Sequence, residues 1–441
     1  MSSSRASAAC TPRVLVQLVA MLCLKCVLAS SPAAVASVNI ELGGQVTVSA
    51  GGVLRVGGSD AVSTVSLPSP SPPSWPPPSP PPPPLILSLG SLHSCAYLTD
   101  HTLKCWGYNY YGQVGDGTNT QRNRPTTIEI GGPVAGLALG VWHSCAALVN
   151  GELKCWGRNS DGELGDGTTT NRNMPITIDV GGAVEHVALG ADYTCASLAG
   201  GALKCWGKNN KGQLGDGTTT ARSIPTAVDV GGAVERLALG SHAGYSHTCA
   251  SLVGGSLRCW GSGAYGELGD GTGSDRYTPT TIDIGDAAVE RLALGYSTTC
   301  VSIVGGALKC WGKNDYGQLG DGTTTNRHTP TTIDVDGAVE HLALGADFTC
   351  AALATGALKC WGRNHVGQLG DGTTSDRRTP GTAIEVGGAI DLVALAQRAH
   401  GGSACAHIAG GVLKCWGKNG YGQLGDGTTT DRSRPTTIDG A

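Results

Sequence analysis

Cysteine is the residue type whose spacing could most clearly do chemistry in this chain. Fourteen of the 17 cysteines form seven pairs, and the two members of each pair are ten positions apart. An even separation across an odd-length hairpin turn places both cysteines opposite each other on neighbouring strands, with Cα atoms about 4.5–5.5 Å apart, a distance that a disulfide tolerates. We therefore predict seven disulfides, one in each hairpin, and an oxidising compartment. The predicted pairs are Cys95 with Cys105, Cys145 with Cys155, Cys195 with Cys205, Cys249 with Cys259, Cys300 with Cys310, Cys350 with Cys360 and Cys405 with Cys415.

The sequence also allows two other chemical states for these cysteines. Fourteen reduced thiols could act as small buried hydrophobic groups. Zinc fits less well, because two cysteines in a hairpin supply only half of a tetrahedral site and no C-x-x-C occurs among them. The other three cysteines, Cys10, Cys23 and Cys26, lie in the first 36 residues.

The remaining candidate chemistry is sparse, and we expect no enzyme, no cofactor and no metal. Neither H-E-x-x-H nor G-x-S-x-G occurs. The recurring G-Q-L-G-D-G-T-T loop lacks the Lys-Ser/Thr ending and the strand–loop–helix context of a phosphate-binding loop. Calcium is conceivable where residues 159–162 precede Asp166, but no glutamate follows at the twelfth position and most copies lack the second acid. A hydrolase or lyase function would rest on fold analogy alone.

An internal repeat supplies the elements that must position the cysteines. Cys-Trp-Gly recurs seven times, at intervals of 50, 50, 54, 51, 50 and 55 residues. Short runs rich in Val, Ile, Leu, Ala and Thr alternate with Gly, Asn and Asp turns, which predicts four short strands per copy. The 69 glycines exclude a helical bundle. Seven four-stranded sheets favour an all-β, seven-bladed β-propeller; the alternative is a linear β-solenoid, which normally needs unlike capping repeats.

The repeat resembles a known family. The segment 194–217 reads T-C-A-S-L-A-G-G-A-L-K-C-W-G-K-N-N-K-G-Q-L-G-D-G, and all seven copies carry W-G-x-x-x-x-G-[QE]-[LV]-G. Kelch propellers have a similar period but place Gly-Gly ahead of Tyr and Trp within one blade. The copies here instead resemble RCC1 repeats, of the regulator of chromosome condensation type. This resemblance implies a seven-bladed propeller used for protein binding, in a family that includes exchange factors for small GTPases, photoreceptors and a secreted bacterial inhibitor of β-lactamase.

Residues that recur in every copy are expected to serve the blade rather than a single binding site. We predict that each tryptophan packs between neighbouring blades and that an Arg–Asp bridge fastens each long loop. A ring of seven arginines for a polyanion, and nucleic-acid binding in general, are disfavoured by 26 basic against 32 acidic residues from Leu85 onward. The arginines are Arg122, Arg172, Arg222, Arg276, Arg327, Arg377 and Arg432, and the aspartates are Asp116, Asp166, Asp216, Asp270, Asp321, Asp371 and Asp426.

Departures from the repeat are where we expect a partner to bind. Two equivalent loops are each expanded by four residues, at 241–247 and 396–402. Both should emerge on one face of the disc, and loops on a rigid scaffold are natural binding surfaces. Exposed tyrosines near the variable position of the long loops are typical anchors, although drift in exposed loops is the alternative. The candidate partner-binding residues are His242, Tyr245, His247, Arg398, His400, Tyr110, Tyr111, Tyr265, Tyr316 and Tyr421.

The N-terminus reads as a targeting segment followed by a spacer. Residues 1–36 lack acidic side chains and carry an apolar run and an A-x-A site, so we predict a secretory signal peptide, with an organelle transit peptide as the alternative. Residues 37–67 alternate apolar and polar side chains, which predicts a short β-rich stretch. Residues 68–84 are almost entirely Pro and Ser and predict an extended linker. The propeller then occupies residues 85–441.

These features favour one function over another. We predict a secreted, non-enzymatic propeller that is monomeric, has no membrane span in its mature form, and binds an unidentified protein, with a wall or matrix component as one option. The alternative function is guanine-nucleotide exchange on a small GTPase. The alternative location is an organelle lumen. Cytosolic exchange activity is opposed by the N-terminus and by the cysteine pairs.

Overall fold

The computed structural model describes residues 36–40, 46–50, 86–240, 244–396 and 402–438. The chain divides into two units, Met1–Pro80 and Pro81–Ala441, which we describe separately. In the first unit, β1 (Ala36–Ile40) and β2 (Val46–Ala50) form an antiparallel pair. The predicted signal peptide, apart from its last residue, and the predicted linker lie outside the described residues.

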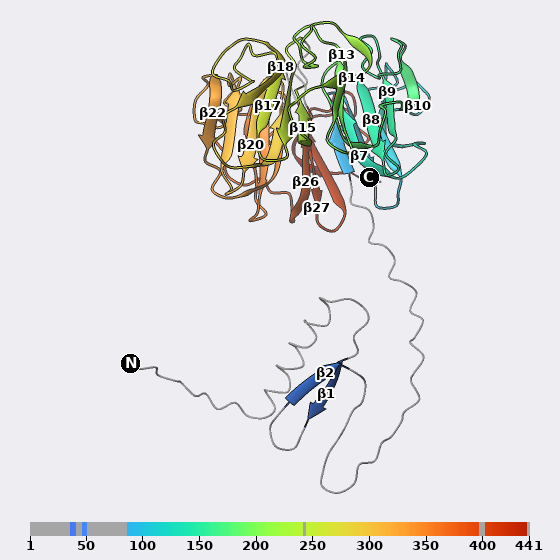
Figure 1. Ribbon diagram of the computed structural model, residues 1–441. Helices are drawn as coiled ribbons and strands as arrows, with labels where there is room; N and C mark the ends of the chain where they lie inside the picture. Colours follow the sequence, from blue (N-terminus) through green and yellow to red (C-terminus); the bar gives the residue numbers. More distant parts are fainter. Residues whose placement is uncertain (1–35, 41–45, 51–85, 241–243, 397–401, 439–441) are drawn as a thin grey trace, which may run out of the picture. The chain divides into compact units, whose positions relative to one another are not determined.

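The second unit is an all-β, seven-bladed propeller, as predicted (Figure 1). Each blade is a sheet of strands that are consecutive in sequence, and no helix occurs among the described residues, so none of these residues forms a helix that could cross a membrane. We number the blades 1 to 7 along the chain. The first strands are β3 (Ile86–Leu89), β7 (Val134–Leu139), β11 (Val184–Leu189), β15 (Val234–Leu239), β19 (Val289–Leu294), β23 (Val339–Leu344) and β26 (Ile390–Leu395).

The other strands follow in the same order along each blade, and blade 6 has no fourth strand among the described residues. The second strands are β4 (His93–Tyr97), β8 (His143–Leu148), β12 (Tyr193–Leu198), β16 (His247–Leu252), β20 (Thr298–Ile303), β24 (Phe348–Leu353) and β27 (Ser403–Ile408). The third strands are β5 (Leu103–Gly107), β9 (Leu153–Gly157), β13 (Leu203–Gly207), β17 (Leu257–Gly261), β21 (Leu308–Gly312), β25 (Leu358–Gly362) and β28 (Val412–Gly417). The fourth strands are β6 (Arg122–Ile128), β10 (Arg172–Ile178), β14 (Arg222–Val228), β18 (Arg276–Ile282), β22 (Arg327–Ile333) and β29 (Arg432–Thr437).

The first strand of each blade lines the centre of the ring. Each of these strands lies against the first strand of the next blade, and β26 of blade 7 lies against β3 of blade 1, which closes the ring. Among the described strands none crosses from one blade to another, because every sheet consists of consecutive strands. The ring therefore closes by side-chain packing and hydrogen bonds between blades 7 and 1.

The seven predicted disulfides are confirmed. The second and third strands of each blade pair so that the two cysteines are directly opposed, as Cys195 and Cys205 are in β12 and β13. The S–S distances are 2.03–2.12 Å and the Cα–Cα distances 4.1–4.2 Å. All fourteen cysteines are buried, so each bridge lies inside the core of its blade.

The pairing of the cysteines is the same as the sequence predicts in every blade. Neither reduced thiols nor half zinc sites describe these residues, because each sulfur is bonded to its partner in the same hairpin. The bridges join Cys95 to Cys105, Cys145 to Cys155, Cys195 to Cys205, Cys249 to Cys259, Cys300 to Cys310, Cys350 to Cys360 and Cys405 to Cys415.

The recurring tryptophan joins neighbouring blades, as predicted. Trp156 of blade 2 packs in one apolar cluster with Leu103 and Val114 of blade 1, and its Nε1–H donates to the main-chain oxygen of Gln113 at 2.9 Å. Gly115 touches the same indole: its φ is 88°, and a Cβ there would lie 2.6 Å from Trp156 Nε1. The recurring glycine of G-[QE]-[LV]-G is thus required by both backbone conformation and packing.

The carbonyl that accepts from tryptophan also accepts from a hydroxyl of the same neighbouring blade. Between blades 5 and 6, Trp361 Nε1 and Thr349 Oγ1 both donate to the main-chain oxygen of Gln318, at 3.0 Å and 2.8 Å. At ring closure, Trp106 Nε1 and Ser94 Oγ donate in the same way to Gln423 O, both at 2.9 Å. Ring closure thus repeats the contact used between sequential blades.

Thr349→Val is expected to lower the free energy of unfolding by about 0.5–1.5 kcal/mol, the usual net contribution of one hydrogen bond. The loss should be small because Trp361 still satisfies the carbonyl of Gln318. Blade 7 already tolerates this arrangement, since Ala404 occupies the equivalent position and Trp416 donates to Gln368 O. Urea denaturation of the two proteins measures the difference, and a loss above about 3 kcal/mol would show a further role for the hydroxyl.

Blade 6 departs from the predicted four strands. Its sheet contains only β23, β24 and β25 among the described residues, and Arg377 pairs with Gly362 only as an isolated bridge. The sequence explains the loss: other blades place an apolar residue three positions after the strand proline, whereas Pro380 is followed by Gly381 and Ile384 comes four positions later. The extra residue shifts the register, yet Ile384 N still donates to Leu358 O at 2.7 Å.

Candidate partner-binding face

Two loops of every blade emerge at the same end of the sheet, and together they form what we call the loop face. The short loop joins the first and second strands, and the long loop joins the third and fourth. A main-chain hydrogen bond ties the two together within each blade, as from Tyr108 N to Leu92 O at 2.9 Å and from Arg158 N to Trp142 O at 3.0 Å. The loop face is thus anchored to the sheets in every blade.

A buried asparagine fixes the conformation of the long loop. Asn109 Oδ1 accepts from Val114 N at 2.9 Å, and its amide nitrogen donates to Asp116 Oδ1, Thr118 O and Thr120 O at 3.1–3.2 Å. Equivalent asparagines occupy six blades, and Gly263 replaces the residue in blade 4. Sequence reasoning missed this role, although the recurrence of N three positions after W was visible.

The Arg–Asp bridges are confirmed in all seven blades. The guanidinium–carboxylate distances are 2.6–2.7 Å, and every aspartate side chain is buried while its arginine is partly exposed. Burial alone would raise the pKa of Asp216, but hydrogen bonds from Thr218 and Arg222 outweigh it and lower that pKa below its ordinary value. A carboxyl with a lowered pKa in the folded state stabilises the fold above its unfolded pKa, and that contribution is lost as the pH falls through the folded pKa.

Asp216→Asn is expected to lower the free energy of unfolding at neutral pH by about 1.5–3 kcal/mol, the usual contribution of a hydrogen bond to a charged group. The difference should shrink as the pH falls below about 4, because the unfolded wild-type carboxyl then takes up a proton, and it should vanish once the pH lies below the lowered folded pKa. Urea denaturation as a function of pH measures both effects. Asp286→Asn, at an exposed position, is the matched control and should change little; equal losses in the two variants would contradict the bridge's role.

Five aromatic side chains from three blades gather on the loop face, and we call them the aromatic cluster: Tyr108, Tyr110, Tyr111, Trp142 and Tyr421. Ring centroids lie 5.1 Å apart for Tyr108–Tyr421, 5.9 Å for Tyr108–Trp142, 5.5 Å for Tyr111–Trp142 and 5.0 Å for Tyr110–Tyr111. Tyr110 is 65% exposed, and the other four rings are partly exposed. The cluster spans the junction at which blade 7 meets blade 1.

A second group combines aromatic rings with cations. Tyr245, from the expanded loop of blade 4, lies 6.1 Å from Tyr265, and Lys211 lies over its ring at 5.4 Å. Lys313 lies over Tyr265 at 5.7 Å, and the Arg363 guanidinium lies 4.3 Å from the centroid of Tyr316. The loop face therefore offers neutral rings around blades 7, 1 and 2, and rings paired with cations around blades 3 to 6.

The structure sorts the residues predicted to bind a partner. It brings Tyr110, Tyr111 and Tyr421 into the aromatic cluster, and Tyr245, Tyr265 and Tyr316 into the second group. Tyr108 and Trp142 were missed, because their positions are occupied by other residue types in other blades and only the three-dimensional placement brings them together.

The prediction that His247 contacts a partner is wrong. Its side chain is fully buried, and its Nε2 lies 2.8 Å from Thr299 Oγ1 of the next blade. It begins β16 and occupies the same position as the buried His93 and His143, so it belongs to the contact between blades. His242, Arg398 and His400 lie outside the described residues.

Three acidic residues that could approach a metal ion are instead held by a cation. The carboxylates of Asp161, Glu163 and Asp192 lie within 4.8 Å of one another. The Arg158 guanidinium lies among them, at 2.9 Å from Asp161, 3.4 Å from Glu163 and 2.5 Å from Asp192. In the loop at residues 159–166, where calcium was considered, Asp161 is paired with Arg158 and Asp166 with Arg172.

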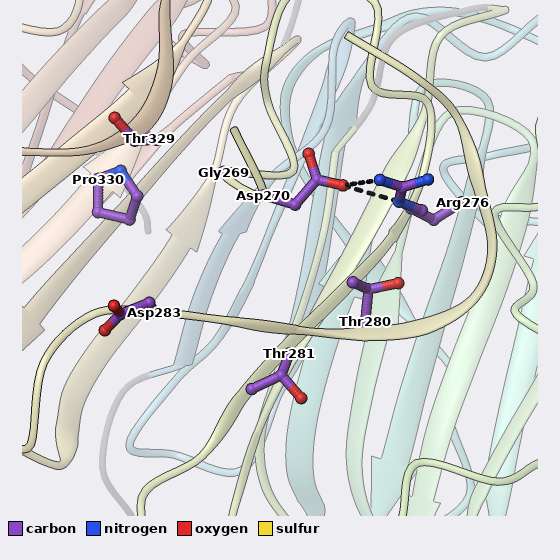
Figure 2. A pocket seen from close by; sticks show the side chains of 8 residues that line it. All are labelled: Gly269, Asp270, Arg276, Thr280, Thr281, Asp283, Thr329 and Pro330. Carbon is purple, nitrogen blue, oxygen red and sulfur yellow. Dashed lines mark hydrogen bonds and ion pairs between the residues drawn. The ribbon is translucent and has the colours of Figure 1, made fainter. Parts of the chain in front are cut away.

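One surface pocket lies where the long loop of blade 4 meets the fourth strand of that blade, β18. Figure 2 shows its lining between blades 4 and 5, with Asp270 bonded to Arg276 and with Thr329 and Pro330 on the opposite wall. The same Arg–Asp pair recurs in every blade. This pocket is therefore a consequence of the repeat and not a distinct site.

The comparison with known families identifies the fold. The family model described as RCC1-like domain matches residues 76–406, and the regulator of chromosome condensation (RCC1) repeat matches residues 411–441. The chain belongs to the RCC1-like domain family. The resemblance inferred from W-G-x-x-x-x-G-[QE]-[LV]-G is thus confirmed.

Individual relatives in this RCC1-like family have low sequence identity to the chain or match only part of it. The chain is 36% identical over 92 residues to the ultraviolet-B receptor UVR8 of Arabidopsis thaliana, which covers 20% of this chain and 21% of the receptor. It is 27% identical over 214 residues to the human E3 ubiquitin-protein ligase HERC2, covering 45% of this chain and 4% of the ligase. The matches therefore span only small parts of these two relatives.

Solved structures show the same RCC1-like fold. Human WBSCR16 superposes with a TM-score of 0.68 at 19% identity, covering 76% of this chain and 93% of that one. Yeast RCC1 (Prp20), bound to Kap60, superposes with a TM-score of 0.63 at 20% identity, covering 70% and 77%. At these identities the likeness establishes architecture alone.

Proposed function

We propose that this RCC1-like propeller is a non-enzymatic, protein-binding module that acts outside the cytosol and docks its partner on the loop face. The observation that carries the proposal is the concentration of partly exposed aromatic rings on anchored loops. Tyrosine and tryptophan provide large, rigid contact areas at low entropic cost and dominate binding hot spots. The disulfides support a location in an oxidising compartment.

Binding is tested by capture with the full chain, produced and processed in a secretory host. Extracellular proteins of the source cells are passed over immobilised wild-type protein and over two variants. Tyr110→Ala alters the loop face, whereas Val304→Ala alters an exposed turn at the opposite ends of the sheets and is the matched control. We expect Tyr110→Ala alone to lose a captured protein. A partner retained equally by all three proteins would contradict docking on the loop face.

Location is tested separately with a reporter fused to residues 1–84. We expect export and cleavage after Ala36, which N-terminal sequencing of the exported product detects. Retention in the cytosol would overturn the location and would favour the alternative, guanine-nucleotide exchange on a small GTPase. A nucleotide-release assay then tests that alternative directly.

A further inference from the structure

The aromatic cluster is not required by the fold. In blade 1 the second, fourth and fifth positions after the tryptophan are Tyr108, Tyr110 and Tyr111. The same positions in blade 2 hold Arg158, Ser160 and Asp161, and those in blade 3 hold Lys208, Asn210 and Lys211. All three blades form the same long loop with the same buried asparagine contacts. Three loop positions are thus aromatic in blade 1, whose Tyr108 contacts Tyr421.

The five rings of the cluster carry no charge, and the cations of the two neighbouring blades at the position of Tyr108, Arg158 and Lys418, are paired with carboxylates. Arg158, Lys313 and Arg363 occupy in their blades the position that Tyr108 occupies in blade 1. Each of these cations contacts a carboxylate on the loop face. Burial and the neighbouring phenols raise the pKa of Tyr108 above its ordinary value, so its phenol stays protonated at neutral pH. A complementary ligand is therefore uncharged and apolar, with groups that can accept hydrogen bonds from phenols.

The ring spacing is compatible with an extended peptide ligand. The steps Tyr421–Tyr108 and Tyr108–Trp142 are 5.1 Å and 5.9 Å between centroids, and both pairs meet edge to face. A polyproline II chain rises about 3.1 Å per residue, so each step corresponds to about two of its residues. Its carbonyls make no internal hydrogen bonds and are free to accept from tyrosine hydroxyls. Proline-rich segments dock on aromatic-lined surfaces because they are already extended and lose little entropy.

We propose that the aromatic cluster binds a proline-rich segment of a partner protein in the polyproline II conformation. This inference rests on the proposed function and names the chemistry of the partner for one part of the loop face. The segment lies across the junction of blades 7, 1 and 2, with prolines against the rings and carbonyls toward the phenol hydroxyls. The second group, with its cations, makes no contribution to this contact.

Fluorescence anisotropy with a labelled oligoproline peptide tests the proposal on the full chain. We expect saturable binding by the wild type and no binding of a Gly/Ser peptide of the same length. Tyr110→Ala and Tyr421→Ala should each weaken oligoproline binding at least about fivefold, a typical cost for an aromatic anchor. Tyr265→Ala, which removes a ring from the second group, is the matched control and should change the affinity less than about twofold.

Competition and a folding check keep the outcomes separate. Far-UV circular dichroism of each variant must match the wild type, and Tyr110→Phe, which keeps the ring, should bind more tightly than Tyr110→Ala. Absence of oligoproline binding, equal weakening by Tyr265→Ala, or displacement of the peptide by a neutral oligosaccharide would overturn the proposal. If oligoproline fails while partner capture still depends on Tyr110, only this inference falls; if capture also loses that dependence, the proposed function falls with it.

Discussion

Removal of a single disulfide is expected to lower the free energy of unfolding by roughly 2–3 kcal/mol, and removal of all seven by on the order of 15–20 kcal/mol. Each bridge closes a loop with a sequence separation of ten, and chain-entropy arguments give that range for so short a loop. Folded domains are stabilised by only about 5–15 kcal/mol in total. The fully reduced chain should therefore not hold the propeller fold.

The double variant Cys195→Ala/Cys205→Ala measures the contribution of one bridge in urea denaturation. The same change at Cys300 and Cys310 is the matched control and should cost a similar amount, because the loop length is identical. Buried sulfurs also predict that the native protein resists reductant until denaturant opens the blades. Intact-mass measurement after alkylation without reductant tests the disulfides directly. Alkylation of all fourteen cysteines would refute them.

The features that recur in every copy could be predicted from the sequence. Seven copies in one chain distinguish residues that each blade needs from residues that occur in one blade only. The opposed cysteines, the tryptophan between blades and the Arg–Asp bridge each appear seven times, and each prediction is confirmed. The role of Asn109 was not predicted for a different reason: most of its contacts are to main-chain groups 5 to 11 residues away, and such contacts leave no partner residue to match in the sequence.

Contacts between blades were harder to predict, since they join residues that are far apart in the chain. Tyr421 of blade 7 meets Tyr108 of blade 1 only because the ring closes, and Trp142 meets Tyr108 across the junction of blades 1 and 2. No local spacing encodes either contact. His247 was predicted to be exposed because it lies next to an expanded loop. Its position in the repeat is, however, that of a buried strand residue. The lost strand of blade 6 shows the converse, since the extra Gly381 was present in the sequence and its effect on register followed directly.

Two blades carry a carboxyl where the others carry an amide. Glu267 of blade 4 and Glu163 of blade 2 replace the glutamine found in the other five blades, and both side chains are buried. Burial raises the pKa of Glu267 from 4.5 to about 7. Its Oε2 accepts from Tyr265 N at 2.7 Å, the same bond that Gln318 Oε1 makes with Tyr316 N at 3.0 Å. An amide thus satisfies the loop equally well without a charge to desolvate.

Glu267→Gln is expected to stabilise the propeller by up to about 3 kcal/mol at pH 8 and to change it little below about pH 4.5. The sign follows from the raised pKa: the unfolded chain releases the proton first, so wild-type stability is lost as the pH rises from about 4.5 to about 7. Urea midpoints of both proteins across this range isolate the effect, because all other groups are shared. Gln113→Glu in blade 1 is the reciprocal variant of Glu267→Gln in blade 4. The two blades are comparable because the second position after the tryptophan holds Tyr108 in blade 1 and Ser262 in blade 4, and neither is a cation. Gln113→Glu should acquire the pH dependence that Glu267→Gln loses, and a difference that stays constant with pH in both variants would show that Glu267 does not titrate in this range.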